Sequence, residues 1–439
     1  MQMNDLAYHL NEQICSVNPI VFEMLSSLGK RIYFPSKGIL SQSAEAHKLA
    51  KNFNATIGTA MEGTTAMNLP CVMDNLPGIS PNEALLYAPS YGLKPLRDAW
   101  KAKILHDNPS LKDVPFSTPV VTCGLTHALS LVGDLFVDPG DTVLMPDLCW
   151  DNYLLNFQDR LQANLEFFPF FDGERMNVKG FEERLGHMLP GEKILAVLNF
   201  PNNPTGYTPG EKDGQALADA LLAAAERGVR VVALVDDAYF GLFYAQDSMR
   251  ESLFCKLAGK SRNLLAIKAD AATKECYVWG LRVGFLSYSI GGADTADSPL
   301  YTALEAKTAG QIRAVISNCS ALSQRVVTKA LTNEGFYEQR HRCEEIMRTR
   351  YDRTRKTLDE HPEYRKFFTA YPFNSGYFMC IRFNDLRADE VRRHLLDKYG
   401  AGGIAMGERD FRLAFSSLDE EEIAPLFQTI YQACLDLSV

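Results

Sequence analysis

The sequence predicts an α/β protein whose large domain is built on a mostly parallel sheet and whose second, smaller domain is α+β. Two patterns carry this prediction. Short apolar runs alternate with amphipathic stretches in the middle of the chain, and a long charged helical stretch precedes short strands near the C-terminus. The chain has 439 residues, 46% of them hydrophobic, which is enough for a sizeable core. Length alone allows about three domains at roughly 150 residues each, but a large sheet uses more residues, so we expect two.

Four apolar runs in the middle of the chain are expected to be buried strands. They span residues 142–145, 194–198, 229–235 and 263–267. Between the second and third runs, residues 211–227 are rich in Ala and Leu at helical spacing and are followed by Gly228. Continuous apolar strands separated by helices are typical of a parallel sheet that is covered on both faces.

The C-terminal part has a different pattern. A heavily charged helical stretch is expected over residues 324–358, with Gly335 as its internal glycine. The elements expected after it are a strand at 376–381, a helix at 388–399 and a strand at 411–415. The first ~75 residues read as irregular, with a helix near 43–52. These features predict a smaller α+β unit that a long helix joins to the centre.

Composition excludes several classes of protein. The formal net charge of −9, from 45 basic and 54 acidic residues, argues against a nucleic-acid-binding surface. No apolar run approaches the ~20 residues that cross a bilayer, and the start has no secretory pattern, so we expect no membrane partner and a cytoplasmic location. The ten cysteines and eight histidines are dispersed without metal-ligand spacing, which predicts reduced thiols and no metal site.

Polar motifs follow three of the predicted strands, where ligands of parallel sheets bind. Asn-Phe-Pro-Asn-Asn-Pro-Thr-Gly occupies 199–206, and Asp-Asp-Ala-Tyr occupies 236–239. Lys-Ala-Asp-Ala-Ala-Thr-Lys occupies 268–274 and is followed by Gly-Leu-Arg-Val-Gly at 280–284. Each motif alone has an ordinary interpretation as a turn, a helix cap or a solvated charge. Their shared order and spacing favour one functional site.

In this order the motifs resemble the fold-type I pyridoxal-phosphate enzymes, specifically the aspartate-aminotransferase-like (class I and II aminotransferase) family, across nearly the whole chain. The resemblance implies a seven-stranded type of sheet, pyridoxal 5'-phosphate as cofactor, and a homodimer with composite active sites. It also implies a division into an N-terminal arm with part of the small domain (1–75), a large cofactor-binding domain (76–320) and a C-terminal small domain (321–439).

Lys274 is the residue expected to hold the cofactor aldehyde as a Schiff base. A lysine amine does this when its pKa is low enough for the neutral form to react, and the freed amine can then carry a proton between the substrate Cα and the cofactor. Lys268 is the nearest competitor, but it lies 14 positions before Arg282 rather than eight. Arg282 offers a planar, permanently charged group to the cofactor phosphate.

Asp236 is expected opposite the pyridine nitrogen, where its carboxylate keeps the ring protonated as an electron sink. Asp237 is the alternative, but the family spacing to Tyr239 favours Asp236, and we expect Asp237 to be solvent-facing or capping. Asn203 and Tyr239 resemble the pair that hydrogen-bonds the cofactor's phenolic oxygen, and Asn203 is also expected beside the substrate. The resemblance suggests a cis peptide bond between Asn203 and Pro204.

Further cofactor contacts follow from the same resemblance. The strand, turn and helix over residues 120–129 are similar to the family's phosphate cup, which places Gly124 and Leu125 at the phosphate. Trp150 resembles the aromatic residue that stacks on the cofactor ring. Tyr87 resembles the tyrosine that reaches the phosphate bound by the neighbouring subunit.

On the substrate side, Arg412 resembles the arginine that binds the α-carboxylate, a task suited to a bidentate guanidinium. Gly58 resembles the N-terminal glycine that closes over the substrate. Arg313 is similar in position to the second arginine, supplied by the other subunit, of dicarboxylate-specific members. An exposed helix arginine near the interface is the alternative interpretation of Arg313.

One position departs from the family pattern. Ala271 stands where many relatives have a serine that donates to the phosphate, so we expect water or another donor to replace it. Thr273 adjoins the lysine, and Asp270 is an unexpected neighbour for a phosphate dianion.

The predicted function is therefore a pyridoxal-phosphate-dependent aminotransferase that passes the amino group of an L-amino acid to a 2-oxo acid by a ping-pong mechanism. The alternative on the same scaffold is another reaction of the cofactor, such as that of a C–S β-lyase or a decarboxylase. A ligand-sensing regulator would need a basic DNA-binding extension, which the first ~75 residues do not provide. The amino-acid substrate is left open, because specificity depends on loops and partner contacts.

Overall fold

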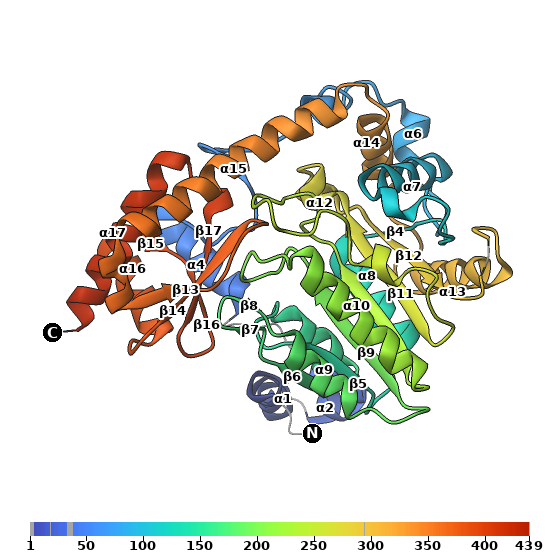
Figure 1. Ribbon diagram of the computed structural model, residues 1–439, viewed down its shortest axis with the longest axis horizontal. Coiled ribbons are helices and arrows are strands. Elements are labelled where there is room, and N and C mark those ends of the chain that lie inside the picture. Colours follow the sequence, from blue (N-terminus) through green and yellow to red (C-terminus); the bar gives the residue numbers. More distant parts are fainter. Residues whose placement is uncertain (1–3, 18, 33–37, 294, 439) are drawn as a thin grey trace.

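The computed structural model describes residues 4–17, 19–32, 38–293 and 295–438. Figure 1 shows a large unit built around one sheet and a smaller unit beside it, with the long helix α15 (Phe336–Glu360) running from one to the other. Among the described residues, no helix has the length and apolarity needed to cross a membrane.

The large unit contains a mixed sheet of seven strands in the order β4-β12-β11-β10-β9-β5-β6. Along the chain these are β4 (Val120–Thr122), β5 (Thr142–Pro146), β6 (Asn164–Phe168), β9 (Lys193–Asn199), β10 (Arg230–Asp236), β11 (Leu264–Ala271) and β12 (Gly284–Ile290). β12 is antiparallel to both of its neighbours, whereas the pairs from β11 to β6 are parallel. The predicted α/β class with a mostly parallel sheet is therefore confirmed.

All four strands predicted from apolar runs are present as β5, β9, β10 and β11. Two further strands, β6 and β12, have no continuous apolar run. β12 contains the buried residues Ser287 and Ser289 between its apolar residues. It therefore lacks the continuous apolar run from which the other strands were predicted.

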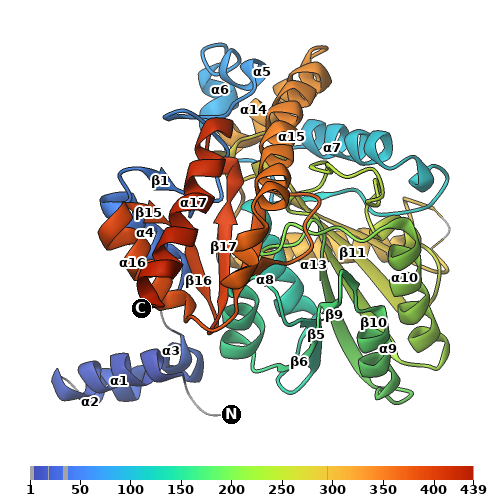
Figure 2. The same cartoon turned by 60° about the vertical axis from the view of Figure 1, so that its left-hand side comes forward.

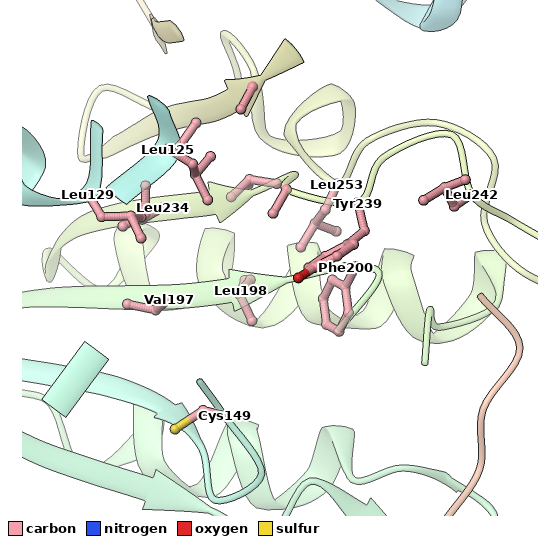
Figure 3. Packing of buried hydrophobic residues seen from close by; sticks show 14 of the residues in the cluster. Leu125, Leu129, Cys149, Val197, Leu198, Phe200, Leu234, Tyr239, Leu242 and Leu253 are labelled. Carbon is pink, nitrogen blue, oxygen red and sulfur yellow. The ribbon is translucent and has the colours of Figure 1, made fainter. Parts of the chain in front are cut away.

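Helices cover both faces of this sheet. Figure 2 shows α8 and α10 on opposite sides of it. The principal helices here are α7 (Lys94–Asp107), α8 (Gly124–Phe136), α9 (Val178–Gly186), α10 (Glu211–Glu226) and α13 (Pro299–Val315). In α10, Leu217, Leu221 and Ala224 are buried at helical spacing, so one apolar stripe faces the sheet. Leu125 and Leu129 of α8 and Leu234 of β10 belong to one cluster of buried hydrophobic residues, part of which is drawn in Figure 3.

The smaller unit has a four-stranded antiparallel sheet in the order β13-β14-β17-β16. Its elements are β13 (Phe368–Ala370), β14 (Phe378–Phe383), α16 (Ala388–Tyr399), β16 (Ile404–Met406), β17 (Asp410–Ala414) and α17 (Glu420–Leu437). This sheet matches the predicted α+β character. The prediction of one continuous helix over 324–358 is wrong, because this stretch belongs to two helices, α14 (Ala321–Leu331) and α15. The turn between them is closed by Asn333 Oδ1, which accepts the Gly335 N–H at 2.9 Å.

The N-terminal part is more helical than predicted. It contains α1 (Asp5–Val17), α2 (Pro19–Met24), α3 (Ser27–Arg31) and α4 (Ile39–Leu49), the last near the helix expected at 43–52. Strand β1 (Phe53–Asn54) pairs with β15 (Ala401–Gly402), so this stretch adds to the smaller unit. The division at residues 75 and 320 stays a prediction.

A buried ion-pair cluster lies beneath the ends of β10 and β11. The Lys268 ammonium pairs with the carboxylates of Asp237 and, at 2.7 Å, of Asp270. Ser252 donates to Asp237 at 2.6 Å and the Trp100 indole to Asp270 at 3.0 Å. The expectation that Asp237 is solvent-facing or capping is therefore wrong, and Asp270 is explained as a partner of Lys268.

Candidate active site

The predicted site residues gather at a cavity of about 340 Å³ where the carboxyl ends of β9, β10 and β11 meet the smaller unit. Those that line it are Gly58, Leu125, Trp150, Asn203, Asp236, Tyr239, Lys274, Arg282 and Arg412. A larger hollow of about 730 Å³ elsewhere in the chain contains none of them. The predicted site residues therefore do not line the larger of these two hollows.

Lys274 lies on α12 (Ala272–Glu275), the short helix that follows β11 directly. Its Nζ is 4.6 Å from the centre of the Tyr239 ring. Burial in the cavity lowers the pKa of Lys274 to about 8; nearby Asp236 raises it, while Arg282 and Arg412 lower it further. The neutral amine is therefore accessible near neutral pH, as the predicted chemistry requires.

Lys268, the alternative lysine, lies in an environment that favours its charged form. Burial by itself lowers the pKa of Lys268, but the two carboxylates of the ion-pair cluster outweigh burial and raise it well above its usual value. Lys268 does not line the cavity. Its amine remains a charged structural partner, and the choice of Lys274 over Lys268 follows from geometry as well as spacing.

Asp236, the last residue of β10, is almost wholly buried. Its carboxylate accepts the Tyr153 hydroxyl at 2.6 Å, the Asn199 amide at 3.2 Å and the Ala238 N–H at 3.0 Å. Burial raises the pKa of Asp236, and these hydrogen bonds and Lys274 oppose that rise. The sequence analysis missed Tyr153 and Asn199 as functional residues, although both belong to segments it singled out.

Arg412 of β17 connects the two units across the cavity. It donates to Asn203 Oδ1 at 3.0 Å and to the Thr56 carbonyl at 3.1 Å. Its guanidinium carbon lies 4.2 Å from the centre of the Phe378 ring. The Nε atom is buried without a hydrogen-bond partner among the described residues, so one donor of the fixed guanidinium is unsatisfied.

The cis peptide bond near the Asn-Pro-Thr-Gly turn is at a different position from the one expected. Among the described residues, the cis peptide bond is at Phe200–Pro201, so the expectation of a cis bond before Pro204 is wrong.

The start of α8 and the Arg282 guanidinium lie against each other. Gly124, the first residue of this helix, has φ +74°, and a Cβ placed there would be 2.4 Å from an Arg282 nitrogen. Any side chain at position 124 would therefore displace Arg282. The positive end of the helix dipole and the guanidinium therefore lie side by side, an arrangement that favours an anion.

Two other donors of the cavity have no partner among the described residues: the Thr273 hydroxyl and the Trp279 indole N–H. Trp150 is half-buried and meets Tyr153 edge-on at 5.7 Å. Gly58 lies close to Phe378, whose ring would be 3.4 Å from a Cβ there.

Three predicted residues are not among those that line this cavity: Gly124, which directly precedes the lining residue Leu125, and also Tyr87 and Arg313. Tyr87 is 92% exposed. Arg313 is on the exposed side of α13 and donates to the Ser317 hydroxyl at 2.5 Å. Tyr87 and Arg313 were both predicted to act on a neighbouring subunit, so a single chain leaves their roles as predictions.

The fold and the lysine–aspartate–arginine cavity together define the class of fold-type I pyridoxal-phosphate enzymes. Residues 54–430 match the sequence model of the family described as aminotransferase class I and II. The chain belongs to this family, which confirms the predicted resemblance. The enzyme class expected from the sequence, an aminotransferase dependent on pyridoxal 5'-phosphate, is the class of this family.

Sequence identity to individual relatives is low. The chain is 28% identical to the 2-aminoadipate transaminase of Thermus thermophilus over 353 residues, which cover 78% of this chain and 79% of that protein. It is 28% identical to a probable aspartate/prephenate aminotransferase of Aquifex aeolicus over 211 residues, which cover 46% of this chain and 48% of that protein, about half its length. A solved aminotransferase structure from Anaerococcus prevotii superimposes with a TM-score of 0.80 at 21% identity, over 94% of this chain and 99% of that one; this similarity shows the fold.

The residues around the cavity fit pyridoxal 5'-phosphate on observations of this chain alone. The cations Lys274, Arg282 and Arg412 face one cavity that also holds a buried carboxylate at Asp236. Thr273 presents a buried hydroxyl without a partner among the described residues. An aldehyde-bearing phosphate ester supplies the acceptors that these donors need.

The pKa of Lys274 generates a prediction for the protein freed of cofactor. The rate constant for covalent capture of pyridoxal 5'-phosphate should rise about tenfold per pH unit below pH 8 and level off above it, because only the neutral amine attacks an aldehyde. Stopped-flow absorbance across pH 6–11 measures this, with Lys274→Ala as the control that captures none. A rate that still rises toward pH 10, as for an ordinary lysine, would contradict the buried environment.

Proposed function

We propose that the chain catalyses transamination between an L-amino acid and a 2-oxo acid by a ping-pong mechanism with pyridoxal 5'-phosphate. The observation that carries the proposal is the Lys274 amine, whose pKa is lowered to about 8 in a cavity that it shares with Asp236, Arg282 and Arg412. When bound, the cofactor supplies an electron sink for the bond broken at the substrate Cα. The residues of the chain then attach the cofactor, bind its ring and phosphate, transfer a proton, balance charge and bind the substrate carboxylate.

Lys274 is assigned attachment of the cofactor and, once released, removal and return of the proton at the substrate Cα. Asp236 is assigned the pyridine nitrogen, where its buried carboxylate, held by Tyr153 and Asn199, favours the protonated ring. Tyr239 lies next to the lysine amine, and with Asn203 it is assigned the cofactor's phenolic oxygen. Trp150 is assigned stacking on the ring.

Arg412 is assigned the α-carboxylate of the substrate. Its bonds to Asn203 and to the Thr56 carbonyl hold the guanidinium plane in place while the Nε donor stays free. A preorganised planar donor binds a carboxylate at a low entropic cost. Gly58 lies beside Phe378 at the cavity wall and is assigned to the segment that closes over the substrate.

The phosphate is assigned to Arg282, Gly124 and Leu125, together with the Thr273 hydroxyl. Thr273 is adjacent to Lys274, faces the same cavity and has no partner among the described residues. We propose that this hydroxyl takes the place of the serine that is missing at Ala271.

A homodimer with composite sites is proposed from one exposed apolar segment. Leu85, Leu86 and Tyr87 are 81%, 63% and 92% exposed in the single chain. Three consecutive exposed apolar or aromatic residues favour burial in an interface. A second copy of the chain seated here would bring Tyr87 to the partner's phosphate site. A cytoplasmic location stays a prediction from the composition.

A half-reaction experiment tests the proposed function. The cofactor-loaded protein is mixed with one amino acid at a time, without a 2-oxo acid, using aspartate, glutamate, alanine, aromatic and branched-chain amino acids. Transamination predicts that one equivalent of 2-oxo acid appears while the cofactor absorbance changes to that of its amine form, and that a 2-oxo acid reverses the change. Continuous release of pyruvate with ammonia would identify a β-lyase instead, and release of carbon dioxide a decarboxylase.

Arg313 is proposed to bind the side-chain carboxylate of a dicarboxylic substrate in the neighbouring subunit. Arg313→Ala should then lower kcat/KM for aspartate and glutamate by about 10- to 100-fold, the range expected for losing a hydrogen bond between charged groups, and leave alanine unchanged. Arg342→Ala, at another exposed arginine, is the matched control. Full retention of dicarboxylate activity in Arg313→Ala would refute this role.

A further inference from the structure

Trp279 presents a hydrogen-bond donor that the proposed function does not use. It begins the single turn η3 (Trp279–Leu281), between Lys274 and Arg282 in the sequence, and lines the same cavity. Its indole N–H is shielded from solvent and has no partner among the described residues. Buried donors in folded proteins are nearly always paired with protein, ligand or ordered water.

The indole is held in place by its surroundings. Its ring meets the Tyr277 ring edge-on at 5.8 Å and the Tyr377 ring at 6.5 Å. The backbone around it is fixed as well: the Val278 N–H donates to Thr273 at 3.0 Å, and the Leu281 N–H donates to Val278 at 3.0 Å. The position of the donor is therefore set before a ligand arrives, so that little side-chain entropy is lost on binding.

The charge of the cavity indicates the kind of ligand atom. Arg282 and Arg412 give it two permanent cations, against the one carboxylate of Asp236 among the residues that line it. An indole N–H only donates, so it can serve an acceptor and not a cation. An anionic oxygen is the acceptor that such a cavity attracts, and hydrogen bonds to charged acceptors are the stronger ones.

We propose that Trp279 is a further ligand-binding residue, whose indole N–H donates to an anionic oxygen of the bound ligand. Two sources offer this chemistry: the phosphate of the cofactor and the carboxylate of the amino acid. The inference rests on the proposed function, because both ligands belong to that reaction.

The test compares the wild-type protein with Trp279→Phe, which keeps an aromatic ring and removes the N–H. Dissociation constants are measured for pyridoxal 5'-phosphate and for pyridoxal, together with the amino-acid concentration that half-saturates the half-reaction. Loss of one hydrogen bond to an anion should weaken binding about tenfold, or ~1.4 kcal/mol. Weaker binding of pyridoxal 5'-phosphate with unchanged pyridoxal assigns the phosphate. A raised half-saturation with unchanged cofactor binding assigns the carboxylate.

Tyr277→Phe is the matched control, because Tyr277 also carries a buried hydroxyl without a partner among the described residues but does not line the cavity. It should leave all three constants unchanged. If Trp279→Phe matches the wild type in every arm, the inference is overturned and the indole is satisfied by water. A wild-type protein that captures no cofactor would overturn the proposed function instead, so the two failures are distinguishable.

A second measurement does not depend on the folding of Trp279→Phe. The chain has three tryptophans, so its indole ¹H–¹⁵N spectrum is simple, and Trp100→Phe and Trp150→Phe assign the remaining signal to Trp279. Solvent exchange of the Trp279 indole proton should slow at least about tenfold when pyridoxal 5'-phosphate or the amino acid is added. Unchanged exchange with both ligands present would also overturn the inference.

Discussion

The removal of the Lys274 ammonium from water is the constraint on which the rest of the site depends. Burial alone favours the neutral amine, two arginines reinforce it, and Asp236 limits the shift, so that the pKa is lowered to about 8. This pKa depends on a fixed separation between the end of β10, which carries Asp236, and the short helix after β11, which carries Lys274. Six residue pairs of parallel ladder hold the two strands together, and the buried Lys268 cluster joins them again just below the cavity. A second buried pair, between Lys103 and Glu275, anchors the residue that follows Lys274.

The two units are joined at the substrate side of the cavity. Arg412 reaches across to Asn203, and the turn that carries Asn203 packs directly on the smaller unit. At Gly206 in that turn, φ is +71° and a Cβ would lie 1.9 Å from the Phe378 carbonyl oxygen. Only glycine permits this approach. Arg412, which we propose binds the α-carboxylate, is thus positioned by contacts with the large unit, so the proposed carboxylate binding depends on the relative placement of the two units.

The sequence was sufficient where the information is local. Apolar runs predicted the central strands, and the order of short motifs after them predicted that Lys274, Asp236, Asn203 and Arg282 meet at one site, as their common cavity shows. It was not sufficient where a partner lies far along the chain. Tyr153 is 83 positions from Asp236, and Trp100 is 170 positions from Asp270, so no spacing rule connects them. The roles of Tyr87 and Arg313 depend on a second chain, which no pattern within one chain describes.

Mapping of the trapped cofactor tests the central claim most directly. The cofactor-loaded protein is reduced with borohydride and digested, and the site of the phosphopyridoxyl group is identified by tandem mass spectrometry. We predict that the group is on Lys274, with none on Lys268, whose amine is held as an ammonium between two carboxylates. A group on Lys268, on another lysine, or on no residue of the chain would contradict this prediction.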